Sequence, residues 1–351
     1  MSEELEVHNE VDAVGGEWDA LAKRVGAWPF LRPGWVAAWW SAFGSGSLAI
    51  IAHRVDGRLR GVLPVVRRDS VVDTPANYHT PVFGPVAEDQ HSARALANAV
   101  FDHYPTRARL VFLEHEPTFL PSLRDAATHA RYRLVERVIL HAPYIELEGG
   151  WDQYWASRSG KLRNSARRLR KRLEELGDVS LDIVRGREAL GSCVEEALQI
   201  EASGWKGRAG TAIASEPATQ GFYEKIARWG AEEGLLTLAF LRVNGRGAAM
   251  QFALEDDRAY MNVKVGFDPA FAKFGPGKLL DREMIERAFK AGLKSYEYLG
   301  SAEAYKLDWA DRTHERIEFQ AFAPTVRGAV ARVVHTHGRA LGRRAASLKR
   351  R

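Results

Sequence analysis

The stretch LAIIAHRVDGRLRGVLPVV, residues 48–66, returns later in the chain as LTLAFLRVNGRGAAMQFAL, residues 236–254. Each copy has an apolar run, an Asp-Gly or Asn-Gly pair and a second apolar run. Such pairs favour the tight turn of a β-hairpin, because both turn positions need positive φ. We therefore predict two matching hairpins. The residues that are identical in the two copies are all 188 positions apart, a spacing called the repeat offset below. Leu48, Arg54, Val55, Gly57 and Arg58 match Leu236, Arg242, Val243, Gly245 and Arg246.

The repeat offset extends beyond the hairpins. The helix-like run HSARALANAVFDHY begins at His91, and the offset carries this position to Leu279, inside a second helix-like run. The strand-like run RLVFLEHE, from Arg109, falls within a few residues of SYEYLG, from Ser295. Hairpin, helix and strand thus occur twice in the same order. The fold class predicted is α/β, with two tandem units whose mixed central sheets are flanked by helices.

Domain boundaries follow from the repeat and from local composition. Residues 1–150 are expected to form the first domain and residues 178–325 the second. Residues 151–177 are interpreted as a basic helical connection, because residues 158–172 hold eight basic residues, no acidic one and leucines at helical spacing. A solvated helix face is one interpretation of this segment. The other is an anionic partner that relieves the repulsion between like charges.

Composition restricts the setting. A length of 351 residues indicates about two domains, and 46% hydrophobic residues can build sizeable cores. A single cysteine, Cys193, excludes an internal disulfide and a multi-cysteine metal site, and no metal is expected. The first residues lack the apolar core of a signal peptide, and no apolar run approaches the roughly 20 residues of a membrane span. A cytoplasmic protein is expected.

The net charge of +5 comes from a basic tail, residues 326–351. Residues 327–351 contain eight basic residues and no acidic one, so the rest of the chain has 42 basic against 45 acidic residues. A nearly neutral body weakens a general role in nucleic-acid binding. Apolar residues recur in the tail at near-helical spacing, which is typical of a helix lying on an anionic membrane. Weak attachment to the inner membrane face is one expectation, and a frayed soluble terminus is the alternative.

A glycine-containing stretch, GFDPAFAKFGPGKLL at residues 266–280, marks the point where a loop becomes a helix. The first N–H groups of a helix have no partner within it and attract anions, phosphate above all. A nucleoside-triphosphate P-loop is unlikely here. It would need glycine at the position of Ala272 and Ser or Thr at the position of Leu279. An ordinary turn into a helix is the alternative to an anion site.

Several stretches resemble the GNAT superfamily of acyltransferases. AYMNVKVGFD, the glycine turn and SYEYLGSAEAYKLDWA look like the acyl-CoA-binding half of a GNAT enzyme. The segments PFLRPGWVAAWWSAFG, WDQYWASRSGKLRNSARRLRKRLEELG and EASGWKGRAGTAI are similar to the CelD-like acyltransferases, a subgroup first associated with cellulose biosynthesis. The duplicated unit also resembles Fem-type aminoacyltransferases. The resemblance covers roughly residues 18–310.

The resemblance implies acetyl-CoA or another acyl-CoA as co-substrate. The strand MNVKVGF, with Val263 and Val265, would pair with the two amides of the pantetheine arm. Where the family loop carries Gln or Arg, this sequence has Ala272, which removes one side-chain contact with phosphate. Proline has no N–H, so the backbone donors expected around Pro276 are Gly275, Gly277, Lys278 and Leu279.

The resemblance also implies direct transfer, in which an amine attacks the thioester, a base takes its proton and an acid protonates the thiolate. Glu297 is the candidate base and Tyr305 the candidate acid, with Lys306 beside it. The alternative is that Glu297 pairs with a cation and Tyr305 packs in the core. Candidate substrate-binding residues, each of which has a purely structural alternative, are Glu201, Trp205, Lys206, Gln251 and Arg167.

The predicted function is an acyl-CoA-dependent N-acyltransferase that transfers an acyl group, acetyl in the first instance, to an amine. The acceptor expected is a small molecule, an amino sugar or an envelope precursor. One alternative is a Fem-type enzyme that uses aminoacyl-tRNA. A nucleic-acid partner, tRNA, is expected only in this alternative. A second alternative is a non-catalytic surface-binding protein with the same fold.

Overall fold

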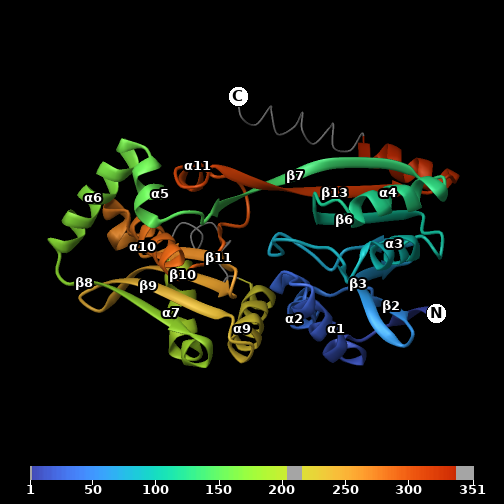
Figure 1. The fold of residues 1–351 in the computed structure, drawn as a ribbon, viewed down its shortest axis with the longest axis horizontal. Coiled ribbons are helices and arrows are strands. Elements are labelled where there is room, and N and C mark those ends of the chain that lie inside the picture. The colour runs from blue at the N-terminus through green and yellow to red at the C-terminus, as the bar shows by residue number, and fades with distance from the viewer. Residues whose placement is uncertain (1, 204–215, 337–351) are drawn as a thin grey trace. The chain divides into compact units, whose positions relative to one another are not determined.

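The computed structural model describes residues 2–203 and 216–336, and it divides into two compact units (Figure 1). Unit 1 comprises residues 1–139 and 315–351, and unit 2 comprises residues 140–314. The chain leaves unit 1 within strand β7 (Arg133–Glu146) and re-enters it within strand β13 (Arg312–Phe322). Residues 151–177, expected as a separate connection, lie inside unit 2.

Unit 1 is built on a mixed sheet with the strand order β1-β2-β3-β4-β6-β13, and β5 pairs with β3. Strand β4 runs parallel to β6, while β1, β2 and β3 are antiparallel neighbours. Its elements are β1 (Glu3–His8), α1 (Gly15–Arg24), α2 (Pro33–Phe43), β2 (Ser47–Val55), β3 (Arg58–Arg68), β4 (Val71–Asp73), β5 (Val86–Ala87), α3 (Gln90–Ala99), β6 (Arg107–Glu114) and α4 (Phe119–His129).

Both faces of the unit 1 sheet are covered, which explains the continuous apolar run of β2. Ile50 and Ala52 pack in one core with Trp18 of α1. Ala49 and Ile51 point to the opposite face and pack in a second core with residues of α3 and α4. Successive strand residues alternate between faces, so a strand buried on both sides needs apolar residues throughout.

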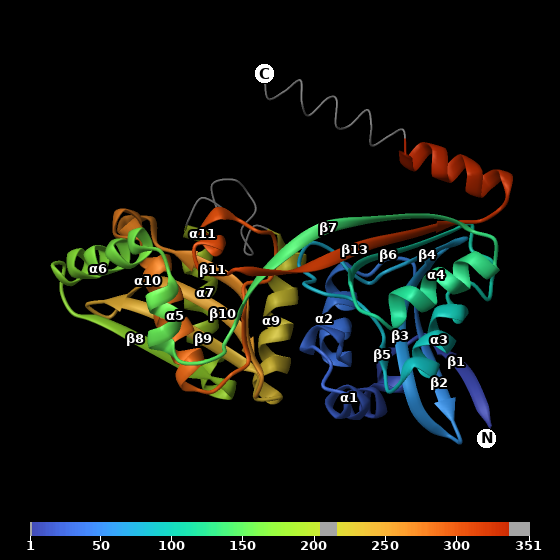
Figure 2. The same cartoon turned by 45° about the horizontal axis from the view of Figure 1, so that its top comes forward.

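Unit 2 has the strand order β7-β12-β11-β10-β9-β8. Helices α10 and α6 lie on one face of this sheet, and α7 and α9 lie on the other (Figures 1 and 2). Its elements are α5 (Trp151–Ser157), α6 (Gly160–Glu174), β8 (Val179–Arg185), α7 (Ser192–Ser203), α9 (Pro217–Glu232), β9 (Leu236–Val243), β10 (Arg246–Glu255), β11 (Ala259–Phe267), α10 (Pro276–Lys290), β12 (Ser295–Glu297) and α11 (Ala304–Leu307).

The predicted hairpin repeat is confirmed in detail. Asp56 and Gly57 have φ of 49° and 76°, and Asn244 and Gly245 have φ of 50° and 80°. Each hairpin then has a one-residue irregularity at the same place, at Arg60 in β3 and at Ala248 in β10. Both turns are therefore the type that the Asp-Gly and Asn-Gly pairs predict.

The same arginine braces each hairpin. Arg54 donates to carboxylates of β1 and α1 and to the carbonyl of Gly57 at 3.2 Å. Arg242 donates to carboxylates of β8 and α7 and to the carbonyl of Gly245 at 3.3 Å. The β1–α1 pair of unit 1 therefore corresponds to the β8–α7 pair of unit 2, a correspondence that sequence analysis did not detect.

The repeat offset also holds for the parallel strands. Val71 of β4 lies opposite Arg107 of β6, and Ala259 of β11 lies opposite Ser295 of β12. The two registers are related by the same offset, as are helices α3 and α10. The fold is therefore α/β with two tandem units of one plan, as predicted.

The basic helix α6 is amphipathic. Ser159 caps it by accepting from the N–H of Leu162 at 3.2 Å, and Leu162, Ala166 and Leu173 are buried in the unit 2 core. Most of the basic side chains of α6 are exposed. The apolar stripe predicted from the leucines thus fixes this helix to unit 2 and leaves its cations at the surface.

The tail begins as a helix over residues 326–336. Gln320 lies 3.0 Å from a ring nitrogen of His335, so this part of the tail is attached to unit 1. The remaining tail residues, 337–351, lie outside the described residues. Among the residues that the structure describes, no helix combines the length and apolar character needed to cross a bilayer.

Candidate active site

The candidate site starts where strands β11 and β12 part. The two strands pair over three residues only, and the last pair is Met261 with Glu297. Beyond it β12 ends, while β11 continues to Phe267 along β10. The register with β10 shifts so that Val263 is an extra residue of β11, a bulge that bends the strand. Val263 and Val265 lie on this bent, half-buried segment.

The glycine loop that follows leads directly into helix α10. Gly275 has φ of 58° and ψ of 48°, a left-handed conformation that suits glycine. Its N–H donates to the carbonyl of Ala272 at 3.1 Å, and the N–H of Leu279 donates back to Gly275 at 3.2 Å. The N–H groups of Gly277 and Lys278 remain in the first turn, where a helix offers no internal acceptor. Among the expected donors, these two are best placed for an anion.

Space and charge around this helix start both suit an anion. A Cβ added to Gly277 would meet no heavy atom within 4 Å. Lys273 and Arg172 lie over the ring of Phe274, at 5.0 and 5.5 Å from its centre. Lys278 pairs with Asp308 at 3.1 Å. Cations from α6 and from the loop thus gather beside the first turn of α10.

A buried polar network lies behind the loop, between α10 and the sheet. Gln251 donates to Asp281 at 2.8 Å, and its amide oxygen accepts from Tyr260 at 2.9 Å and Tyr296 at 3.2 Å. Asn262 donates to the Tyr296 hydroxyl at 3.2 Å. Sequence analysis placed Gln251 in a substrate cleft, whereas the structure places it inside this network.

Asp281 is the carboxylic acid of this network. Burial raises its pKa from 3.8 to about 7, against the opposing effects of the Lys306 charge, the Gln251 hydrogen bond and the Lys278 charge. A carboxyl group that titrates near neutrality inside a core is a frequent mark of a functional site. Sequence analysis missed Asp281 because helical spacing alone makes it one polar residue among several on α10.

Glu297, the predicted base, forms a dyad with a histidine. Its carboxylate lies 3.2 Å from Nε2 of His314 on β13. The His314 ring stacks on Tyr144 at 4.0 Å with 13° between the planes, which fixes its orientation. All three residues belong to unit 2. His314 was missed from the sequence because it follows a loop and matches no spacing rule.

Tyr305, the predicted acid, lies on the short helix α11. Burial raises the pKa of its hydroxyl, and the negative charges of Asp281 and Glu303 raise it further. The residue nevertheless stays 39% exposed. The hydroxyl is therefore protonated at neutral pH and accessible from outside, as a general acid must be.

Lys306 is buried and holds the loop that follows β12. Its Nζ donates to the carbonyls of Leu299 and Ser301, both at 3.1 Å, and pairs with Glu303 at 3.3 Å. Leu299 and Gly300 both have positive φ, 51° and 57°, so this loop needs an external brace. The geometry assigns Lys306 a positioning role beside Tyr305.

The remaining predicted residues lie in three places. Glu201 is buried on α7, where its Cα would lie 2.7 Å from a Cβ added to Gly266 of β11. Arg167 is exposed on α6. Trp205 and Lys206 lie outside the described residues.

Residues 160–307 match the family model of the acetyltransferase (GNAT) domain. The matched segment is similar to a GNAT domain and spans less than half of the chain. It contains the strand parting, the glycine loop, Asp281, Glu297 and Tyr305, so most of the site described above lies within the matched residues. No sequence among the curated proteins matches the chain.

Solved structures share the fold over nearly the whole chain. The C-terminal domain of a candidate lysylphosphatidylglycerol synthetase from Agrobacterium fabrum is 13% identical, with a TM-score of 0.58, over 93% of this chain and 97% of that one. FemX is 11% identical, with a TM-score of 0.59, over 91% and 97%. A conserved protein of unknown function from Bacteroides thetaiotaomicron is 12% identical, with a TM-score of 0.57, over 91% and 100%. At these identities the likeness is one of fold.

Proposed function

We propose that this chain is an N-acyltransferase that uses an acyl-CoA, acetyl-CoA in the first instance, and acts through its GNAT domain. The observation that carries the proposal is the parting of β11 from β12 directly before a helix start with no side-chain cap. A pantetheine arm has two amides that pair with a strand, and a pyrophosphate suits first-turn N–H groups. We place the arm along Val263 and Val265, and the pyrophosphate at Gly277 and Lys278.

The proposed reaction is direct transfer. The amine nitrogen attacks the thioester carbonyl carbon, a new C–N bond forms, and the C–S bond breaks as the thiolate leaves. His314 takes the proton that the amine loses, and Glu297 orients its ring and stabilises the imidazolium. Tyr305 gives its proton to the thiolate. Atoms and charge balance without a covalent enzyme intermediate.

The acceptor proposed is an amine of a small molecule, an amino sugar or an envelope precursor. A neutral amine is the nucleophile, so the base is needed only after attack has begun. The carboxylate of Glu297 beside His314 would also attract the protonated form of the amine to this end of β12.

A second candidate function is transfer from aminoacyl-tRNA. The observation that favours it is the row of exposed cations on α6, which packs against the loop before α10. FemX and the lysylphosphatidylglycerol synthetase domain share this fold. A polyanion longer than CoA would contact many of these cations together.

The deciding experiment supplies purified full-length protein with acetyl-CoA, longer acyl-CoAs or charged tRNA, together with a panel of amines and amino sugars. Release of free thiol or of uncharged tRNA is measured. We expect thiol release that depends on an amine. tRNA release without thiol release would instead favour the second candidate, and binding without turnover of either donor would indicate a non-catalytic protein.

We also propose that the protein is cytoplasmic and that its tail lies weakly on the inner membrane face. Val326, Val330, Val333 and Val334 are exposed on the described part of the tail, beside Arg327 and Arg332. Each basic residue near an anionic surface contributes about 1 kcal/mol. Co-sedimentation with anionic vesicles at low salt tests this: the full chain should pellet, whereas a chain ending at Thr325 should not. Equal behaviour of the two would contradict the proposal.

A further inference from the structure

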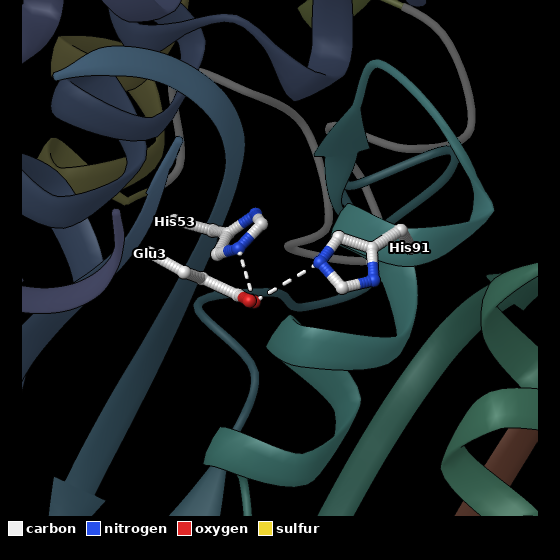
Figure 3. A group of neighbouring side chains, drawn as sticks. All are labelled: Glu3, His53 and His91. Atoms are coloured by element: carbon white, nitrogen blue, oxygen red, sulfur yellow. Dashed lines mark hydrogen bonds and ion pairs between the residues drawn. The ribbon is translucent and has the colours of Figure 1, made fainter. Parts of the chain in front are cut away.

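Three side chains from three elements of unit 1 converge at one point (Figure 3). Glu3 comes from β1, His53 from β2 and His91 from the first turn of α3. Oε1 of Glu3 lies 2.8 Å from Nε2 of His53 and 3.1 Å from Nε2 of His91. The three ligand-type atoms all lie within 4.8 Å of one another.

The repeat shows that the fold does not require polar groups here. Glu3 lies opposite Val55 in unit 1, and Val179 lies opposite Val243 in unit 2. Strand pairing therefore matches Glu3 with a residue of β8, and the repeat offset carries His53 and His91 to residues of β9 and α10. All three positions hold apolar residues in unit 2. These are Val179, Leu241 and Leu279, and they pack in the unit 2 core. An apolar contact thus suffices to close the sheet against the helix at this position.

We propose that Glu3, His53 and His91 bind a divalent transition-metal ion, of which Zn²⁺ fits best. Two imidazole nitrogens and one carboxylate oxygen form a donor set that zinc accepts, and Mg²⁺ and Ca²⁺ prefer oxygen ligands alone. Bonds of about 2.0–2.1 Å in a tetrahedral site separate ligand atoms by roughly 3.3 Å. The separations of Glu3 from His53 and from His91, 2.8 and 3.1 Å, are close to this spacing.

Charge and access also suit a cation. The Glu3 side chain is 48% exposed and supplies a carboxylate as an anionic ligand. Asp89, which caps α3, also lies near His91 and adds negative charge there. His91 is exposed, which leaves an entry path and room for a water as fourth ligand.

The ring of His53 is fully buried, and its Nδ1 meets no hydrogen-bond partner in the described part of the chain. Its orientation is therefore set by the Nε2 contact with Glu3. When the metal binds, each neutral ring carries its proton on Nδ1 and presents the Nε2 lone pair to the ion. Sequence analysis expected no metal, because ligands at positions 3, 53 and 91 show no recognisable spacing.

The consequence is structural and lies in unit 1. Strand β1 is an edge strand held by β2 alone. A metal shared by β1, β2 and α3 would join this edge strand to the helix that covers the sheet. The site is separate from the candidate active site and does not depend on the proposed function.

The test measures Zn²⁺ affinity of the full-length chain, without an affinity tag, by competition with a chromophoric chelator. We expect one tight site, and much weaker binding of Mg²⁺. E3Q and H91N both alter accessible side chains and should weaken Zn²⁺ binding at least about 10- to 100-fold, the range measured even for residues that only support a ligand. H8N is the matched control, because His8 lies on the same strand, 3.0 Å from Glu6, without a second histidine.

Zn²⁺ binding no tighter than that of Mg²⁺ would overturn the proposal. The proposal would equally fail if E3Q and H91N kept the wild-type affinity, or if H8N lost as much affinity as they do. H53N alters a buried side chain, so its folding is checked by circular dichroism before its affinity is compared.

Discussion

The two units share one plan but place their buried polar groups at different positions. Unit 2 buries Asp281, Gln251, Tyr260 and Tyr296 between α10 and its sheet. By the repeat offset, unit 1 has apolar residues at all four positions: Ala93, Leu63, Val72 and Ala108. Unit 1 in turn has its Glu–His–His cluster where unit 2 is apolar. Polar groups in these cores are therefore additions to a plan that packs without them, which points to function rather than folding.

The helix starts differ in the same way. In unit 1 the carboxylate of Asp89 caps α3 by accepting from the N–H of Ser92 at 2.7 Å. In unit 2 the cap position holds Gly275, which offers no side chain. A helix whose first N–H groups already bind a side-chain carboxylate has fewer free donors for a phosphate. The comparison therefore favours unit 2 over unit 1 as the place where the proposed CoA would bind.

The parallel strands differ in length. Strand β4 of unit 1 ends at Asp73, directly after its pairing with β6. Strand β11 of unit 2 continues to Phe267 after β12 has ended. In unit 2 the first strand of the parallel pair, β11, thus extends past its neighbour and provides a place for an added, strand-like ligand. In unit 1 it is the second strand, β6, that continues, to Glu114.

The largest expected effect is on stability, through Asp281. Its pKa is raised in the folded state from 3.8 to about 7, so between these values the folded protein keeps a proton that the unfolded chain has lost. The contribution of Asp281 to the free energy of unfolding is therefore largest below about pH 4 and is lost as pH rises through about 7. Asp281→Asn should remove this loss and stabilise unit 2 above pH 7 by on the order of 4 kcal/mol.

Denaturant unfolding at a series of pH values measures this effect. Asp257→Asn, at a side chain that is 93% exposed, is the matched control and should behave as wild type. If Asp281→Asn unfolds with the same pH dependence as wild type, the carboxyl group titrates normally. The presence of Asp281 where unit 1 has Ala93 would then carry no cost in stability.

The next effect sharpens the contrast between the helix starts. By the repeat offset, Gly277 corresponds to Asp89, although it lies in the first turn of α10 and not at the cap. Gly277→Asp therefore places a carboxylate beside the first-turn N–H groups of α10. The new side chain enters open space and should leave the fold intact. We expect acyl-CoA affinity to fall about 100-fold or more, or about 2.7 kcal/mol, because the carboxylate repels and replaces phosphate.

Calorimetric titration with CoA measures the loss. Asp89→Gly is the matched control: it removes the cap of α3, costs unit 1 a few tenths of a kcal/mol, and should leave CoA affinity unchanged. If Gly277→Asp binds CoA as wild type does, the phosphate site is wrongly placed.

The third prediction concerns catalysis, and its expected effect is of similar size. Tyr305→Phe should lower kcat about 100-fold with little change in the KM for acyl-CoA, because a general acid acts on the leaving thiolate and not in binding. Tyr78→Phe, at a tyrosine of unit 1 that is 74% exposed, is the control. A wild-type rate in Tyr305→Phe would remove the hydroxyl from the mechanism.

The smallest effect concerns the basic face of α6, which has no counterpart in unit 1. Reversing Arg167, Arg168 and Lys171 to glutamate should weaken CoA binding about tenfold at low salt, and the difference should shrink as salt rises. Arg94→Glu on α3 is the control. For a tRNA donor, wild-type binding should depend steeply on salt, and the slope should fall by about one for each phosphate that the variant no longer neutralises. A variant that matches wild type in affinity and salt response would show that α6 is a solvated face.

The sequence was enough for the repeat and for the start of α10. Hairpin turns, the repeat offset and the glycine loop are local signals, and each reflects a backbone conformation that few residues adopt. Glu297 and Tyr305 were reached through family resemblance, and the structure places both near the parting strands. Their roles stay predictions.

The remaining features depend on contacts between distant residues. Asp281 and Gln251 are 30 positions apart and meet only because α10 packs on β10. Lys306 stands beside Tyr305 among the candidate catalytic residues, yet its Nζ contacts three acceptors of the loop after β12. No spacing rule connects positions 3, 53 and 91. Such clusters are set by strand order and helix packing, which a single sequence does not reveal.

The central claim is that one of two similar units binds CoA. Calorimetric titration of the full-length protein with CoA tests it most directly, because the stoichiometry counts the competent units. We predict one site per chain, abolished by Gly277→Asp and kept in Asp89→Gly. Two sites per chain, or one site that survives Gly277→Asp, would contradict the account.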